Sequence, residues 1–112
     1  MAQHEVHMKP GPNRYEPETI TIHVNDEVVW INDGGSHNAA GDNGSPGGFD
    51  TDDVVGTSAP VAFNTPSTNP LGFMYSCTNH HPNMIGHVIV VPAGTPIRDS
   101  ARKAATKDGE AY

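Results

Sequence analysis

The chain has 112 residues and a mass of 11.9 kDa, which fits one domain of ordinary size. Hydrophobic residues make up only 35% of it, and 12 Gly and 10 Pro interrupt most of its length, which argues against a helical bundle and favours a small all-β domain. The formal net charge of −7 argues against a surface that binds nucleic acid or an anionic membrane.

Short strand-like segments follow one another along the chain, separated by turn residues. Residues 19–24 alternate in polarity, with Ile20, Ile22 and Val24 on one face, as in a half-buried strand. The other expected strands are residues 4–8 (an edge strand), 27–32, 60–64, 72–77 and 86–92. Several short strands joined by turns predict a Greek-key β-sandwich or barrel of about seven or eight strands.

Two segments do not fit this strand pattern. Residues 33–53 contain seven Gly or Pro and are expected to form a loop, and a loop of that length in so small a domain is usually functional. After Thr95 the composition changes and basic residues return. We therefore expect a domain over residues 1–96 and a polar C-terminal tail over residues 97–112.

The charges are unevenly distributed along the chain. Residues 15–97, a stretch of 83 residues, contain nine acidic side chains and no Lys or Arg. Protein surfaces normally mix both signs of charge. The stretch without basic residues indicates a positively charged partner or a bound metal cation.

One short segment concentrates the side chains that can bind a soft metal ion. Within eight residues, between two expected strands, it contains a thiol, two imidazoles and a thioether. These belong to Cys77, His80, His81 and Met84. Thiolate, imidazole and a weak axial thioether form the ligand set of a blue-type copper site, which needs a second histidine from elsewhere. His37 is the candidate, because it lies in the loop that directly follows the strand expected at residues 27–32.

Two other roles for Cys77 compete with that of a metal ligand. It is the only cysteine, so it cannot form an internal disulfide. An inert buried thiol is the usual role of a lone cysteine, but the neighbouring His and Met side chains argue against it. A Cys–His nucleophile would also need an orienting third group and an oxyanion hole, and nothing in the sequence points to either.

Three stretches of the sequence resemble the cupredoxin family, in particular its plastocyanin, pseudoazurin and amicyanin group. VVWIND followed by SHN is similar to the family's strand and first-histidine loop, FMYSCTNHHPNM to its ligand loop, and GHVIVV to its closing strand. Together they span most of residues 20–92. The resemblance implies an all-β Greek-key sandwich that binds one copper ion, Cu(I) or Cu(II), through His37, Cys77, His80 and Met84.

The adjacent histidines leave one ligand open. The spacing Cys77-x2-His80-x3-Met84 lies within the range of the plastocyanin-like members and favours His80. The segment His81-Pro82-x-Met84, however, resembles the corresponding motif of amicyanin, so His81 is the alternative to His80. By the same resemblance, the Asn38 side chain would tie the His37 loop to the Cys77 loop.

The resemblance implies an electron carrier and not an enzyme. Such a protein shuttles single electrons between redox partners by outer-sphere transfer, and no substrate bond is made or broken. The alternative is a copper-binding or copper-resistance protein that stores or delivers the metal. Electrons would enter through the imidazole edge of His80, surrounded by an apolar docking patch. We expect this patch to consist of Ala39, Ala40, Pro82, Asn83 and Ile85.

The expected partners are redox proteins with a basic docking surface, because one copper ion does not balance nine acidic residues. Asp42, Asp50, Asp52 and Asp53 would then form a surface that steers the partner. We expect a monomer that binds no nucleic acid and has no membrane span, since no apolar run approaches about 18 residues. The family works outside the cytoplasm, so we expect a periplasmic or exported protein. Residues 1–4 lack the charged and apolar regions of a signal peptide, so we expect that the signal peptide has been removed.

Overall fold

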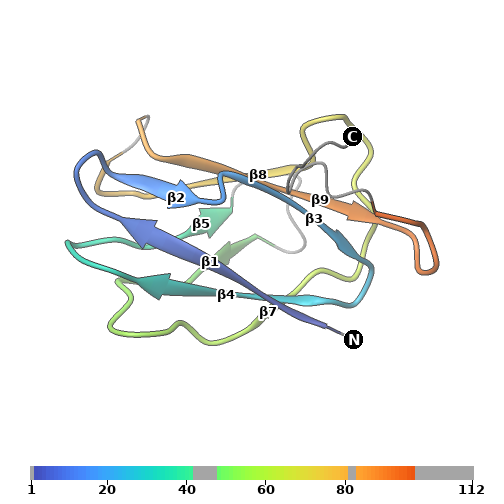
Figure 1. Cartoon of the computed structure of the whole chain (residues 1–112), viewed down its shortest axis with the longest axis horizontal. Helices are drawn as coiled ribbons and strands as arrows, with labels where there is room; N and C mark the ends of the chain where they lie inside the picture. Colours follow the sequence, from blue (N-terminus) through green and yellow to red (C-terminus); the bar gives the residue numbers. More distant parts are fainter. Residues whose placement is uncertain (1, 42–47, 81–82, 98–112) are drawn as a thin grey trace, which may run out of the picture.

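Two β-sheets pack face to face in the computed structural model, which describes residues 2–41, 48–80 and 83–97 (Figure 1). One sheet has four strands in the order β2-β1-β4-β7, and the other has five in the order β3-β9-β8-β5-β6. The strands are β1 (Gln3–Lys9), β2 (Arg14–Glu16), β3 (Thr19–His23), β4 (Glu27–Asn32), β5 (Ala40–Gly41), β6 (Phe49–Asp50), β7 (Val61–Ala62), β8 (Phe73–Ser76) and β9 (Ile85–Val91). The expected all-β sandwich is confirmed, with nine strands in the described residues.

The core lies between the sheets and follows from alternation along the strands. In β9, Gly86, Val88 and Val90 are buried while the residues between them remain half-buried. Trp30 of β4 is fully buried and contacts Tyr75 of β8 edge to face, with ring centroids 5.2 Å apart. Removing a buried aromatic side chain of this kind costs about 3–5 kcal/mol. The aromatic contacts therefore join the two sheets firmly.

Gly86 permits the close packing of Tyr75 at the start of β9. A Cβ atom at this position would overlap the Tyr75 ring, and the ring is almost fully buried. No larger residue fits there without moving either β9 or the aromatic core. Because Gly86 lies two residues after Met84, this contact also restrains the end of the 77–84 segment.

Three features of the sheets differ from the sequence prediction. β1 is not an edge strand, because it lies between β2 and β4 and pairs in parallel with β4 (Figure 1). β2 was not expected, since three residues are too few to show alternation. β5 and β6 lie inside residues 33–53, where the Gly and Asp content predicted only loop. They form an antiparallel pair, with Ala40 opposite Asp50.

The strand pairing brings the expected ligand segments to one end of the sandwich. Ser76, the last residue of β8, pairs with Ile85, the first of β9. Ser76 also pairs with Ala40 of β5, which comes three residues after His37. The segment after β4 and the segment between β8 and β9 therefore lie next to each other.

The expected C-terminal tail lies almost entirely outside the described residues, so its boundary near residue 97 remains a prediction. Within the part of the chain that the structure describes, no helix has the length and apolarity needed to cross a membrane.

At the other end of the sandwich, Asp26 holds the N-terminal strand in place. Its carboxylate accepts hydrogen bonds from the amide of Ala2 (2.9 Å), from Nε2 of His4 (2.9 Å) and from the amide of His23 (3.1 Å). Burial alone would raise the pKa of Asp26, but these hydrogen bonds outweigh it and lower the pKa to about 2. The ionised form of Asp26 therefore stabilises the fold.

Replacing Asp26 with alanine is expected to reduce the free energy of unfolding by about 2 kcal/mol at neutral pH, since it leaves three partly buried donors without their acceptor. The pKa of Asp26 is lower in the folded state than the value near 3.9 of an unfolded chain. Its stabilising contribution is thus complete above about pH 4 and is lost as the pH falls towards 2. Urea unfolding at several pH values measures both effects.

The matched control is Asp52→Asn, which removes one exposed carboxylate. Between pH 4 and 2, Asp52→Asn should lose as much unfolding free energy as wild type. Asp26→Ala should lose less. Equal acid profiles for Asp26→Ala and wild type would contradict this role for Asp26.

Candidate metal centre

Loops at one end of the sandwich carry the four residues that the sequence favours as ligands. His37 lies in the loop between β4 and β5, and Cys77 is the first residue after β8. His80 lies in the turn that begins at Cys77, and Met84 directly precedes β9. Each loop is held by paired strands, so the ends of all these segments are fixed by the sheet.

Three of these residues form a compact cluster of possible metal ligands. One ligand atom from each of His37, Cys77 and His80 can be chosen so that all three lie within 4.8 Å of one another. The Cys77 Sγ atom is 3.3 Å from His80 Nδ1, and the two imidazole centroids are 5.0 Å apart. His37 and Cys77 are fully buried, whereas His80 is half-buried. In the described residues this is the one such cluster of His, Cys, Asp or Glu.

The donor atoms of this cluster fit a copper ion. Neither ring nitrogen of His37 has a hydrogen bond of good geometry, although both atoms are buried. A buried polar group without a partner is unfavourable by about 1–3 kcal/mol, and coordination to a metal would remove that penalty. Burial lowers the pKa of His37 and outweighs a contact with the Gly34 backbone that raises it, while the nearby His80 acts in the same direction as burial. The imidazole is thereby kept neutral, which is the form that binds metals.

Backbone hydrogen bonds shape the segment from Cys77 to Met84. The amide of Cys77 donates to the carbonyl of Met84 (3.1 Å), and the amide of His80 donates to the carbonyl of Cys77 (3.1 Å). Met84 is buried against the core next to β9, with 1% of its surface exposed. The segment therefore closes on itself and places its ligand candidates on a short, tied loop.

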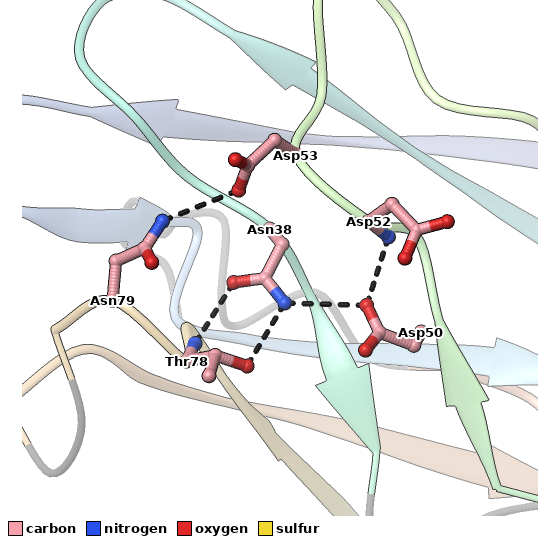
Figure 2. Close-up of a pocket in the computed structure, with 6 residues that line it drawn as sticks. All are labelled: Asn38, Asp50, Asp52, Asp53, Thr78 and Asn79. Carbon is pink, nitrogen blue, oxygen red and sulfur yellow. Dashed lines mark hydrogen bonds between the residues drawn. The ribbon is translucent and has the colours of Figure 1, made fainter.

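Asn38 joins the two ligand loops, as the family resemblance implies. Its Oδ1 accepts a hydrogen bond from the amide of Thr78 (2.8 Å), and its Nδ2 donates to Thr78 Oγ1 (3.0 Å), as Figure 2 shows. Asn38 and Thr78 each directly follow a ligand candidate, His37 and Cys77 respectively. The reciprocal pair of hydrogen bonds thus holds these two ligands at a fixed separation.

A second set of contacts reinforces this connection (Figure 2). Asn79 Nδ2 donates to the carbonyl of Ser36 and to Asp53 Oδ1, both at 3.2 Å. Asn38 Nδ2 also donates to Asp50 Oδ1 at 3.2 Å. Both residues between Cys77 and His80 are polar, and this is the only feature of the sequence that indicates these contacts.

Tyr15 supports the His37 loop from the side of β2, and the sequence analysis missed it. Its hydroxyl donates a hydrogen bond to the carbonyl of Asn38 (2.6 Å), and its ring lies 4.6 Å from the ring of Tyr75. Burial raises the pKa of Tyr15, so the hydroxyl remains a donor. No local pattern distinguishes this tyrosine, because β2 is too short to be recognised.

The structure contradicts one of the surface residues expected near the site and does not describe two others. Ala39 was expected in an apolar docking patch, but it is fully buried because its side chain packs into the core cluster between the sheets. His81 and Pro82 lie outside the described residues. The structure brings His80 to the cluster, and the choice between His80 and His81 remains a prediction.

Replacing Asn38 with alanine should destabilise the protein by about 2–3 kcal/mol, because the amide of Thr78 loses its acceptor. Thr78→Val is the matched control, since it removes only the hydroxyl acceptor, with an expected loss of about 1 kcal/mol. A thiol reagent should also modify Cys77 faster in Asn38→Ala, because the loop above the buried sulfur opens more often. Equal modification rates in wild type and both variants would contradict the role of the Asn38–Thr78 hydrogen bonds in holding the two loops together, which we call the clamp.

Comparison with known proteins agrees with this geometry. The chain matches the family described as copper binding proteins, plastocyanin/azurin family, over residues 2–91. Among solved structures, a pseudoazurin from Sinorhizobium meliltoi aligns with a TM-score of 0.66 and 24% identity, over 83% of this chain and 77% of that chain. A reduced Cu(I) form of an amicyanin variant aligns with a TM-score of 0.65 and 26% identity, over 78% and 80% respectively.

A larger protein also contains this fold. A Cu-containing nitrite reductase from Thermus scotoductus SA-01 aligns with a TM-score of 0.66 and 24% identity, over 83% of this chain but 22% of that chain. No curated protein sequence matches at the significance required. The family match spans most of the chain and agrees with the donor set at the end of the sandwich. The resemblance to the cupredoxins is therefore confirmed: the chain belongs to the plastocyanin/azurin family of copper binding proteins, and its cofactor is copper.

Proposed function

We propose that this protein is a type 1 copper electron carrier whose ligands are His37, Cys77 and His80, with Met84 as a weak axial ligand. The observation that carries the proposal is the cluster of His37, Cys77 and His80, with donor atoms within 4.8 Å at the junction of two clamped loops. One thiolate, two imidazoles and a thioether are the ligands of a blue-type copper site.

The residues of the chain provide the conditions for fast one-electron transfer. When bound, copper supplies a one-electron couple between Cu(II) and Cu(I). The Cys77 sulfur and the neutral imidazoles are acceptable donors to both oxidation states. The hydrogen bonds between Asn38 and Thr78 restrain the two loops that carry His37 and Cys77. Little rearrangement is then needed when the electron arrives.

Exposure indicates where a redox partner would approach. His80 is half-buried, whereas His37 and Cys77 are fully buried. The imidazole edge of His80 is therefore the accessible side of the cluster. Asn83 and Ile85 are at least partly exposed next to this loop and would form part of a small docking surface.

We infer that the protein is not itself an enzyme. A copper enzyme of the nitrite reductase kind needs a further catalytic copper, and the described residues contain one cluster of possible ligands. Storage or delivery of copper is the alternative function. A site of that kind would hold the metal in an adaptable loop, whereas the two loops here are joined by several hydrogen bonds.

The partner we propose is a redox protein with a basic docking surface. Asp50, Asp52 and Asp53 are exposed beside the ligand loops (Figure 2), and Asp42 lies outside the described residues. The described basic residues, Lys9 and Arg14, pair with Asp33 and Glu16 and leave this acidic face unbalanced. We also propose that the protein works as a monomer outside the cytoplasm, as the family resemblance implies.

The copper-loaded protein is expected to show an intense thiolate-to-copper charge-transfer band that bleaches reversibly on reduction. Cys77→Ser should lose the band while the apoprotein still unfolds cooperatively, because serine has almost the same size. Optical and EPR spectra measure this. Fast electron self-exchange would distinguish the carrier from a storage protein, and absence of the band in wild type would refute the proposed site.

The same spectra decide between the two neighbouring histidines. His80→Gly should abolish the band or change it strongly, whereas His81→Gly should leave it nearly unchanged. Loss of the band in His81→Gly alone would reverse the assignment.

Electron transfer with a basic c-type cytochrome is expected to slow as salt is added, because ions screen the attraction between opposite charges. Asp52→Asn should lower the rate constant at low salt by roughly twofold to fivefold. Glu27→Gln is the matched control: it removes the same charge at the start of β4, far along the strand from the ligand loops. A rate that does not depend on salt, or an equal effect of both variants, would rule out the acidic face as the steering surface.

A further inference from the structure

The loop before His37 is shaped by the side chain of Asn32, the last residue of β4. Asn32 Nδ2 donates hydrogen bonds to the carbonyls of Gly35 (2.9 Å) and Val54 (3.0 Å). Its Oδ1 accepts a hydrogen bond from the amide of Gly34 (2.9 Å). One amide group therefore fixes the turn through Gly34 and Gly35 and attaches it to the returning segment at Val54.

This turn places the backbone of Gly35 directly against the imidazole of His37. A Cβ atom on Gly35 would lie 2.8 Å from Nε2 and 3.3 Å from Cε1 of His37. The His37 ring is fully buried although Gly35 itself is exposed, so the backbone of Gly35 forms part of the thin cover over the ring. Gly35 also has a φ of +90°, which side chains other than glycine rarely adopt.

We propose that Gly35 is a positioning residue for copper, because its missing side chain sets the place of the His37 ring. The His37 atoms that a Cβ on Gly35 would meet are Nε2, Cε1 and Cδ2, so Gly35 lies on the Nε2 side of the ring and the Nδ1 side is the one we assign to the metal. Neither ring nitrogen has a hydrogen bond of good geometry, and the ring contacts the backbone of the turn at Gly34 and Gly35, so close packing restrains it. This inference rests on the proposed role of His37 as a ligand.

A Cβ at this position forces either the ring or the turn to move. The ring is enclosed, and the turn is fixed by the hydrogen bonds of Asn32. A shift of the ring changes its orientation towards Cys77 and His80. Residues that orient metal ligands typically affect metal affinity by about 10–100-fold when they are replaced.

The test compares Gly35→Ala with Gly34→Ala. Gly34 lies in the same turn and also has a positive φ of +150°, but its Cβ would meet Pro10 at 3.2 Å instead of His37. Both variants should lower the urea midpoint of the apoprotein. Only Gly35→Ala should lower Cu(I) affinity, by about tenfold or more, in competition with a chromogenic chelator. It should also alter the Cu(II) hyperfine splitting in EPR, while Gly34→Ala stays within about twofold of wild type in affinity.

A second variant at Gly35 and a spectrum of the metal-free protein also test the positioning role of Gly35. Gly35→Asn carries the same Cβ but tolerates positive φ better, so it replaces Gly35→Ala if that variant does not fold. In the metal-free protein, the proton–nitrogen correlation spectrum of the His37 ring should shift in the Gly35 variants and not in Gly34→Ala. Equal copper affinities and ring spectra for the Gly34 and Gly35 variants would overturn the positioning role.

His37→Gly separates this inference from the proposed function. If His37→Gly retains the affinity and spectrum of wild type, His37 is not a ligand and the proposed ligand set fails. If His37→Gly loses copper while the Gly35 variants behave like Gly34→Ala, only the positioning role of Gly35 fails.

Discussion

Two reciprocal hydrogen bonds between Asn38 and Thr78 set the relation between the loops that carry His37 and Cys77. The two loops are 40 positions apart in sequence, and each residue of the clamp directly follows a ligand candidate. Because Asn38 is almost fully buried, its amide cannot exchange these partners for water without a penalty. Tyr15 and Val54 support the same loop from other directions, through the Asn38 and His37 carbonyls respectively.

The environment of the buried His37 side chain favours binding of a metal ion. Both its ring nitrogens lie away from water without a hydrogen bond of good geometry, which is unfavourable in the apoprotein. Its position is set by packing and by the backbone, so the ring does not relax towards another partner. Binding of copper would satisfy one of these atoms and would therefore stabilise the folded chain as well as load the site.

Much of the fold and the ligand set follow from local sequence patterns, but the supporting contacts do not. Alternation identified β3, a run of strand-forming residues identified β9, and the cluster of thiol, imidazole and thioether side chains between two strands identified the ligand loop. β1 was expected at an edge, because parallel pairing with β4 is a long-range property that alternation does not encode. Tyr15 and Gly35 were missed for the same reason: each acts through a contact with a loop that only the folded sandwich brings near.

The acidic residues beside the site have two roles: they accept hydrogen bonds from the ligand loops, and they give this face its negative charge. Asp50 accepts a hydrogen bond from Asn38, and Asp53 accepts one from Asn79. Both therefore help to hold the ligand loops together and also contribute to the negative surface charge. Asp52 lies between them and is exposed. Replacing aspartate with asparagine removes the charge but keeps an oxygen that can accept a hydrogen bond. Added salt also separates the two roles, because it screens long-range attraction far more than a short hydrogen bond. Rigidity of the loops is therefore expected to persist in high salt, where attraction of a basic partner is lost.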